Sequence, residues 1–322
     1  MMHAIVITGG CGFLGAALAT RIAQEGVTLP DGTRLNAPQI HLWDQLGAPV
    51  PQLPNTQFTA LDIADRAAVR RAMPDNVALV YHLAAVVSGQ AEEDFERAMQ
   101  VNLGGTTAVL EAAKAIRPGV PVIGTSSLAV YGGSPQEPLT EETQIQPQNT
   151  YGVTKAMAEL VMADYRRRGW ADARTLRLPI VTVRPGKPNA AASSFASSII
   201  REPLGGVPTI CPVDPETALW VASPEAAVDA LWHAPSVSSF EWPDFGAVNV
   251  PGLRVQVLTM MAALRARAGD GTADLIEMKP DQQIIDIVGT WPTLFDTSLA
   301  QSLGFTGDAS FDAILDQAFL MK

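Results

Sequence analysis

The feature that most constrains the fold is an alternation of apolar runs with helix-forming segments over residues 1–185. Ala4–Ile7, Val77–His82 and Val120–Ile123 are short runs rich in Val and Ile, and segments such as Glu92–Ile116 separate them. The runs are continuously apolar, which is typical of parallel strands buried on both faces. The pattern predicts an α/β fold: a doubly wound parallel sheet of the Rossmann type.

Residues 186–322 have a different character. Their elements are shorter, and proline and glycine punctuate them often. We expect a smaller, mixed α/β region that covers the substrate, with a soft boundary near residue 185. A later strand near Ala247–Val250 is a candidate to rejoin the main sheet.

Charge and composition exclude several classes of function. The chain has 22 Lys and Arg against 33 Asp and Glu, a net charge of −11. So acidic a chain is not expected to bind nucleic acid or anionic membranes. It has no apolar run of about 18 residues, the length a membrane helix needs, and no signal peptide, so a cytoplasmic protein is expected. The chain has two Cys and four His, and the His are not spaced as metal ligands usually are. Neither a disulfide framework nor a metal site is therefore predicted.

A glycine cluster lies between the first predicted strand and the first predicted helix. Gly9, Gly12 and Gly15 are spaced GxxGxxG, with Phe13 and Leu14 inside the motif. Glycine permits close backbone approach to a pyrophosphate, and a helix N-terminus offers it N–H groups. The motif predicts a dinucleotide site, with a plain glycine-rich turn as the alternative.

Two acidic residues follow the next predicted strands. Residues 26–38, rich in Gly and Pro, are expected to form a surface loop before the second strand. Asp44 ends that strand, where a Rossmann fold places the carboxylate that binds the adenosine ribose. Its charge would repel a 2′-phosphate, so NAD is predicted rather than NADP. Asp62 follows the third strand and is predicted to contact the adenine. The alternatives are a turn cap for Asp44 and a helix N-cap for Asp62.

A YxxxK motif carries the predicted chemistry. Tyr151 and Lys155 are four residues apart, which places both on one face of a helix. A lysine beside the phenol is expected to lower the pKa of Tyr151, so that the phenolate accepts a hydroxyl proton. Ser126 and Ser127 lie upstream, and a serine hydroxyl there is expected to hold the reacting oxygen. His82 is expected to be a structural residue at a strand end, with a role as proton acceptor as the alternative.

These motifs resemble those of the extended short-chain dehydrogenase/reductase family, which includes sugar-nucleotide epimerases. The matching segments are TGGCGFLG at 8–15, YHLAA at 81–85, VNLGGT at 101–106 and TSSLAVYG at 125–132. The resemblance implies a catalytic triad of Ser127, Tyr151 and Lys155, bound NAD, and a homodimer formed by the helices after Glu92 and Tyr151. It adds further residues to the cofactor site: Ile63, Leu83, Ala84, Ala85, Asn102, Pro179 and Ile180.

A narrower resemblance appears downstream. The segments RLPI at 177–180, RPGKPNAAASSF at 184–195, IREPL at 200–204 and CPVDP at 211–215 look like those of the D-erythronate dehydrogenases. That group oxidises C2 of a four-carbon sugar acid to the 2-oxo acid with NAD. The resemblance therefore implies a small sugar acid as substrate.

The same segment supplies candidate substrate ligands. Arg184 and Lys187 are the basic residues nearest the end of the sixth predicted strand, Thr175–Val183, where ligands bind in such folds. A carboxylate in so acidic a chain needs a local cation, and Arg offers bidentate bonds. Asn189 and Ser193 are candidate partners for hydroxyl groups. The alternative is that Arg184 pairs with an acid while the serines cap a helix.

Three other functions are alternatives to a sugar-acid dehydrogenase. A nucleotide-sugar 4-epimerase uses the same triad, but only Arg201 lies between residues 188 and 253 to bind a diphosphate. A 4,6-dehydratase carries an Asp-Glu pair where this chain has Leu128 and Ala129. A non-catalytic NAD-binding protein usually lacks the Tyr or the Lys, which this chain retains.

Overall fold

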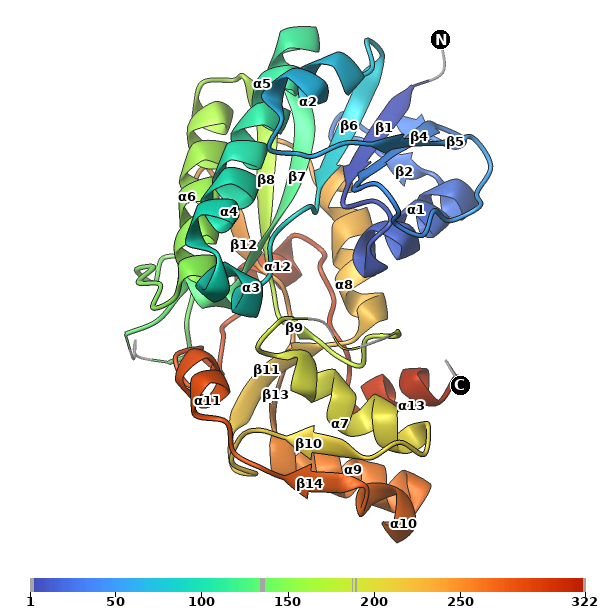
Figure 1. Cartoon of the computed structure of the whole chain (residues 1–322). Helices are drawn as coiled ribbons and strands as arrows, with labels where there is room; N and C mark the ends of the chain where they lie inside the picture. Colours follow the sequence, from blue (N-terminus) through green and yellow to red (C-terminus); the bar gives the residue numbers. More distant parts are fainter. Residues whose placement is uncertain (1–2, 134–136, 187, 189, 321–322) are drawn as a thin grey trace.

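The computed structural model describes residues 3–133, 137–186, 188 and 190–320. Its larger part is a seven-stranded sheet in the order β12-β8-β7-β6-β1-β4-β5, with every pair parallel and helices on both faces (Figure 1). The predicted fold class is thus confirmed. In sheet order the strands are β12 (Ala247–Asn249), β8 (Ala171–Leu178), β7 (Val120–Ser127), β6 (Val77–His82), β1 (Ala4–Thr8), β4 (Gln39–Asp44) and β5 (Thr56–Ala60).

Two apolar clusters hold the helices onto the sheet. One joins the sheet to α1 (Phe13–Glu25) and α8 (Pro224–His233), and the other joins it to α2 (Arg66–Ala72), α5 (Thr106–Ile116) and α6 (Thr150–Arg167). Strands β1 and β6 are buried along their whole length, which explains their unbroken apolar sequence. No helix in the described ranges is both long and apolar enough to cross a bilayer.

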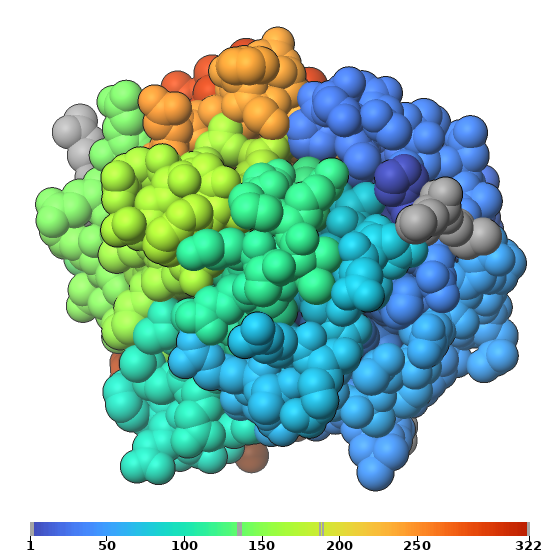
Figure 2. Space-filling view, turned by 90° about the horizontal axis from the view of Figure 1, so that it is seen from above, coloured from blue at the N-terminus to red at the C-terminus, as the bar shows by residue number. Residues whose placement is uncertain are grey.

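Helix α8 comes from the second half of the chain but packs beside α1. Arg21 forms an ion pair with Asp229 and lies 4.6 Å over the ring of Trp232. Viewed from above, the orange C-terminal segments border the blue N-terminal ones (Figure 2). Because β12 also adds to the main sheet, the chain crosses between the two parts more than once.

The smaller part lies at the carboxyl ends of the sheet strands (Figure 1). A three-stranded sheet, β13-β11-β9, and helices around it share a third apolar cluster. Its elements are β9 (Ile180–Val181), α7 (Ser194–Leu204), β10 (Thr209–Cys211), β11 (Ala218–Ala222), β13 (Leu253–Gln256), α9 (Val257–Ala268), α10 (Asp270–Ala273), β14 (Ile276–Met278), α11 (Gln282–Val288) and α13 (Phe311–Leu320). Helix α12 (Ser298–Ser302) instead packs on the main sheet beside β12.

Two predicted elements are divided in the structure. The helix expected over Glu92–Ile116 is instead α3 (Ser88–Glu93), α4 (Phe95–Ala98), a π-helical turn at Met99–Gly105, and α5. It breaks because the Asp94 side chain accepts a bond from Arg97 N and starts a new helix. The strand expected over 175–183 starts at Ala171 and stops before Pro179, which has no N–H to continue the ladder.

The segment 26–38, expected to be a surface loop, contains a small hairpin. Strands β2 (Val27–Thr28) and β3 (Arg34–Leu35) pair in antiparallel fashion. Val27, Leu29 and Leu35 are buried in the core beside α1. The glycines and prolines correctly indicated turns, but the burial of three apolar side chains between them stabilises a hairpin.

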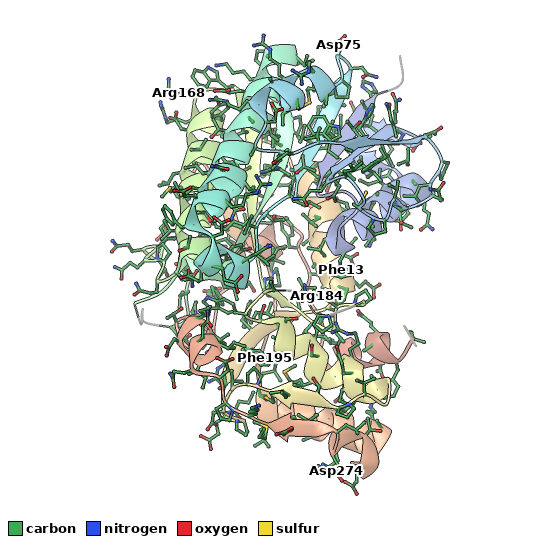
Figure 3. The ribbon with its side chains drawn as sticks, in the orientation of Figure 1. Phe13, Asp75, Arg168, Arg184, Phe195 and Asp274 are labelled. Atoms are coloured by element: carbon green, nitrogen blue, oxygen red, sulfur yellow. The ribbon has the colours of Figure 1, made fainter. Side chains whose placement is uncertain are left out.

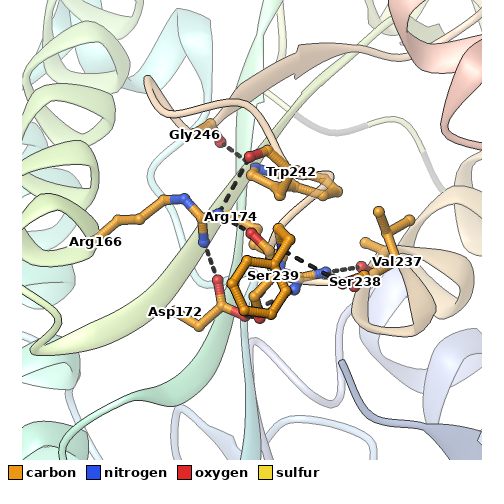
Figure 4. A network of polar contacts seen from close by, with 10 residues as sticks. Arg166, Asp172, Arg174, Val237, Ser238, Ser239, Trp242 and Gly246 are labelled. Carbon is orange, nitrogen blue, oxygen red and sulfur yellow. Dashed lines mark hydrogen bonds and ion pairs between the residues drawn. The ribbon is translucent and has the colours of Figure 1, made fainter. Parts of the chain in front are cut away.

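A buried polar network fastens residues 237–246 to the amino-terminal end of β8 (Figure 4). Arg174 donates to Asp172 at 2.7 Å and to the carbonyls of Ala234 and Val237 at 2.7 and 2.6 Å. Arg166 forms an ion pair with the same carboxylate. This network lies at the opposite end of β8 from the site described next, and it stabilises the return of the chain to the sheet.

Candidate active site

The glycine motif forms the turn between β1 and α1. Gly9 has φ +64°, and a Cβ there would lie 2.9 Å from Ala84 N. A Cβ on Gly15 would lie 2.2 Å from the Gly9 carbonyl oxygen, so the helix can approach the turn only without a side chain. The turn therefore leaves the N-terminus of α1 open to the cavity that follows.

A cavity of about 300 Å³ lies between the carboxyl ends of the strands and the smaller part of the molecule. Figure 3 labels Phe13 and Arg184, which come from the two parts of the molecule and both line this cavity. The lining includes most of the residues predicted for the cofactor and the substrate: Gly9, Gly12, Phe13, Leu14, Gly15, Leu83, Ala85, Ser126, Ser127, Tyr151, Lys155, Pro179, Ile180, Arg184 and Ser193.

A second cavity, of about 320 Å³, shares Gly9, Gly12, Leu83 and Ala85 with the first. The two cavities thus meet along the glycine turn and the loop after β6. The wall of the second cavity also holds the residues predicted to bind the adenosine end of the cofactor: Asp44, Asp62, Ile63 and Ala84.

Asp44 and Asp62 have partners that keep them in this wall. Asp44 accepts bonds from Cys11 N at 2.9 Å and from Gln45 N at 2.8 Å, so it also supports the glycine turn. Asp62 accepts from Ala64 N and forms an ion pair with Arg97 at 2.9 Å. This pair lowers the pKa of Asp62. Asp44 therefore both caps a turn and lines the cavity. Asp62 lines the cavity but is not a helix N-cap, because Asp65 caps α2 by accepting from Ala68 N at 2.9 Å.

Helix α6 brings Tyr151 and Lys155 to the first cavity beside Ser127. The Asn149 side chain caps the helix by accepting from Gly152 N at 2.8 Å. A Cβ on Gly152 would lie 2.0 Å from the Ala129 carbonyl oxygen, so glycine allows α6 to approach the segment after Ser127. The Lys155 ammonium donates to the Thr125 carbonyl at 2.8 Å and lies 5.7 Å from the centre of the Tyr151 ring.

Burial governs the ionisation of these groups. It raises the pKa of Tyr151 to about 12, against a smaller opposing effect of its hydrogen bond with Ser127. It lowers the pKa of Lys155 to about 8, while the carboxylate of Glu159 acts in the opposite direction. The pKa of Tyr151 is therefore not lowered, as the motif had led us to expect, because desolvation dominates.

His82 is fully enclosed between two threonines. Its ring nitrogens lie 2.8 Å from Thr8 Oγ1 and 2.9 Å from Thr106 Oγ1. Burial, and secondarily the charge of Lys155, lowers its pKa to about 3, so it is neutral at pH 7. Because both ring nitrogens are hydrogen-bonded to threonines and His82 is in the lining of neither cavity, we interpret it as a structural residue.

Asn102 differs from its prediction as a cofactor ligand. It is 2% exposed, and its amide bonds to both backbone groups of Val86 at 2.8 and 3.1 Å and to Thr154 Oγ1 at 3.0 Å. These bonds use the amide to fasten the loop after β6 to α6. Asn102 therefore lies behind the cavity wall and positions it.

The predicted substrate ligands fall into two groups. Arg184 and Ser193 line the first cavity, and burial, followed by the charge of Arg201, lowers the pKa of Arg184. Lys187 and Asn189 lie outside the described residues. The Ser126 hydroxyl is buried in the same wall and has no partner among the described atoms.

The cavity also contains residues that the motifs did not indicate. Trp291, which follows α11, lines it from the smaller part of the molecule, and Val87 and Ser88 line it from the junction of the loop after β6 with α3. Arg97 and Gln45 line the second cavity. Gln45 could have been suspected because it follows Asp44, whereas Trp291 is far from every motif in sequence. Within the described ranges, no three His, Cys, Asp or Glu side chains are grouped to hold a metal ion.

Comparison with known proteins agrees with this geometry. Residues 5–213 match the model of the NAD dependent epimerase/dehydratase family. The chain is 45% identical to the D-erythronate dehydrogenase of Cupriavidus necator over 97% of this chain and 96% of that one, and 37% identical to that of Haemophilus influenzae over 97% and 98%. A crystal structure described as a nucleoside-diphosphate-sugar epimerase from Agrobacterium tumefaciens superposes with a TM-score of 0.87 at 34% identity, covering 98% of this chain and 92% of that one.

The chain therefore belongs to the NAD dependent epimerase/dehydratase family, as the sequence motifs predicted. The two full-length dehydrogenase relatives place it among the NAD-dependent oxidoreductases of that family.

Proposed function

We propose that this protein oxidises the C2 hydroxyl of a small, D-erythronate-like sugar acid to the 2-oxo acid, with NAD as the hydride acceptor. The observation that carries the proposal is the first cavity, because one small space is lined by Ser127, Tyr151, Lys155 and Arg184. It combines a group for proton transfer with a cation for a carboxylate. The two D-erythronate dehydrogenases similar over almost the whole chain support the choice of substrate.

The residues present fit a dinucleotide. Gly9 and Gly15 leave a cradle at the N-terminus of α1 that a Cβ would fill, and this suits the pyrophosphate. Asp44, in the second cavity, would bind the adenosine ribose, and Lys155 would bind the nicotinamide ribose. When bound, NAD supplies the hydride acceptor. The charge of Asp44 opposes a 2′-phosphate and favours NAD over NADP.

Side chains of the protein would carry out the transfer of the hydroxyl proton. The Ser127 hydroxyl holds the substrate oxygen next to Tyr151, and the Tyr151 phenolate accepts the proton from the C2 hydroxyl. Lys155 stabilises that phenolate by its charge. Because burial favours the neutral phenol, the phenolate depends on the charge of Lys155, and the rate of oxidation should fall where Lys155 loses its proton at alkaline pH. Arg184 would hold the carboxylate and so present C2 to the cofactor.

The two parts of the molecule would share this work. Residues 1–185 would bind NAD, and residues 186–322 would form the substrate-binding region, with α8 and β12 returning to the main sheet. A homodimer would form through α4 and α6, because Phe95 and Leu160 are 57% and 53% exposed on these helices. Light scattering coupled to gel filtration should give twice the chain mass, and Leu160→Asp should give the monomer.

A nucleotide-sugar 4-epimerase is the second candidate, and the similarity to the Agrobacterium tumefaciens structure supports it. The size of the first cavity favours the dehydrogenase. A volume of about 300 Å³ is at the lower end for ligand pockets, and here it must hold both the nicotinamide end and the substrate. A four-carbon acid fits that space better than a nucleoside diphosphate sugar.

The proposal is tested by NADH formation with purified protein, NAD and a panel of four-carbon sugar acids, with UDP-sugars in parallel. We expect NADH absorbance to rise with a sugar acid and no interconversion of UDP-glucose and UDP-galactose. UDP-sugar interconversion without NADH release would establish the epimerase instead.

A further inference from the structure

A buried ion pair lies next to Lys155. Arg177, near the end of β8, donates to both oxygens of the Glu159 carboxylate on α6, at 2.9 and 2.7 Å. Each side chain is only 1% exposed. Arg177 also donates to the Tyr131 hydroxyl at 2.5 Å, and Tyr131 lies 2.9 Å from Asn249 Oδ1 on β12. The pair thus joins α6 to two strands and to the segment after Ser127.

Helix geometry places this pair against Lys155. Glu159 follows Lys155 by four residues, so both side chains lie on one face of α6. Lys155 is 6% exposed, and water screens its charge poorly. The Glu159 carboxylate raises the pKa of Lys155 against the effect of burial. Arg177 neutralises the same carboxylate and so limits its effect.

We propose that Glu159 and Arg177 are positioning residues that together set the charge of the Lys155 side chain. Glu159 favours the ammonium, and Arg177 prevents Glu159 from binding Lys155 directly and drawing it away from the Thr125 carbonyl. Neither residue lines the cavity, so both act through Lys155. The consequence for catalysis rests on the proposed function, but the effect on Lys155 does not.

Other charged or titratable groups also face Lys155, and they would contribute in every variant. They are Tyr151 on α6, His82 at the end of β6 and, across the cavity, Arg184. His82 is neutral at pH 7, and the phenol of Tyr151 is neutral up to high pH. Glu159 is therefore the anion that matters for Lys155 near pH 8.

The two partners should have opposite effects when they are removed. Glu159→Gln removes the anion and leaves the Arg177 cation, so the pKa of Lys155 should fall by about one unit. Arg177→Met leaves the Glu159 anion uncompensated, so the pKa of Lys155 should rise by a similar amount. A merely structural role would disturb the site in the same direction in both variants.

The experiment is an NMR titration of the lysine side chains. The chain has only five lysines, so protein labelled with carbon-13 at the lysine Cε gives few signals. A Lys155→Met variant assigns the signal of interest. We expect the titration midpoint to lie lowest in Glu159→Gln, near pH 8 in the wild type and highest in Arg177→Met. Equal midpoints, or shifts of the same sign, would overturn the proposal.

The second buried pair on β8 provides matched controls. Arg174 is 0% exposed and also binds a carboxylate, that of Asp172, but at the far end of the strand. Asp172→Asn and Arg174→Met should destabilise the protein in the same way and leave the Lys155 titration unchanged. A shift in these variants would mean that general loosening, and not local charge, moves the midpoint.

A double variant covers the case in which the single variants do not fold. A lone buried charge is the main cost of breaking such a pair, so Glu159→Gln with Arg177→Met together should be less destabilised. Its Lys155 midpoint should lie close to that of the wild type, because the two opposite shifts are of similar size. A midpoint displaced by about one unit or more in the folded double variant would contradict the proposal.

Turnover gives an independent reading. The alkaline limb of kcat/KM for the sugar acid should follow the Lys155 midpoint, moving to lower pH in Glu159→Gln and to higher pH in Arg177→Met. If the wild type oxidises no sugar acid, the proposed function fails and the NMR titration still decides this inference. If the wild type is active and both variants keep the wild-type limb and midpoint, the inference fails while the proposed function stands.

Discussion

The two walls of the active-site cavity are built in different ways. One wall, the sheet wall, consists of the sheet edge and α6. Ser127 ends a strand that is hydrogen-bonded to neighbours on both sides, and Tyr151 lies in the first turn of a capped helix. The other wall, the loop wall, consists of loops of the smaller part. Its residues Arg184, Ser193 and Trp291 lie outside strands and helices. The first wall holds its groups in fixed geometry, as proton transfer requires. The second wall consists of segments that can change without disturbing the sheet.

This difference suggests a division of labour. Groups on the sheet wall should affect kcat, because they act on the reacting atoms. Groups on the loop wall should affect KM and substrate choice, because they hold the rest of the substrate. Substitutions on the two walls should therefore separate these kinetic parameters.

The largest effect is expected on the sheet wall. Tyr151→Phe removes the proposed proton acceptor but keeps the ring, and kcat should fall by about 10²- to 10⁴-fold because general base catalysis is worth that much. The Kd of NAD, measured by calorimetry, should be little changed. Tyr165→Phe near the C-terminal end of the same helix is the control and should leave kcat unchanged, because Tyr165 packs on Trp170. A kcat within about threefold of the wild type would place the proton acceptor elsewhere.

On the loop wall, Arg184→Met removes a cation but keeps an apolar stem. KM for the sugar acid should rise about 10- to 150-fold, the value of a charge-assisted hydrogen bond, with a smaller change in kcat. Arg265→Met, in an exposed ion-paired position, provides the control. If steady-state kinetics give a KM within about twofold of wild type, other groups bind the carboxylate.

A smaller effect is expected where the cofactor meets the second cavity. Asp44→Asn removes the charge that opposes a 2′-phosphate and weakens binding of the adenosine ribose. The ratio of kcat/KM for NADP to that for NAD should rise about tenfold, because one charge interaction is lost. Asp31→Asn in an exposed turn should leave the ratio unchanged. A wild-type enzyme that uses NADP as well as NAD would refute this role of Asp44.

The smallest effect is expected at Trp291. Trp291→Leu widens the loop wall, and KM for a four-carbon acid should rise about 3- to 10-fold, while kcat/KM for a five-carbon acid should improve relative to it. Trp170→Leu is the control, because Trp170 packs between Lys114 and Arg168 away from the cavity. An unchanged preference between the two acids would show that Trp291 does not limit substrate length.

The sequence predicted the sheet wall better than the loop wall, for physical reasons. The glycine turn and the YxxxK helix are set by local backbone geometry, so the spacing of Gly9, Gly15, Tyr151 and Lys155 already implies their placement. Trp291 reaches the cavity through contacts between distant segments, which no local pattern encodes.

The sequence also did not predict how deeply the residues of the site are buried. The spacing of Tyr151 and Lys155 suggested a lowered tyrosine pKa, but the structure shows that desolvation of the site dominates. Asn102 matched a cofactor motif, yet its amide is used to fasten the wall to α6. A motif gives the identity of a residue at a place, and the packing around it decides which of its atoms remain available.

The central claim is that hydride leaves C2 of a small sugar acid and is carried away on NAD. It is tested most directly with D-erythronate that carries deuterium only at C2. We expect the deuterium in the NADH produced, a slower rate than with unlabelled acid, and a 2-oxo acid as product. Unlabelled NADH together with deuterium retained in the product, or no NADH from any sugar acid, would contradict the account.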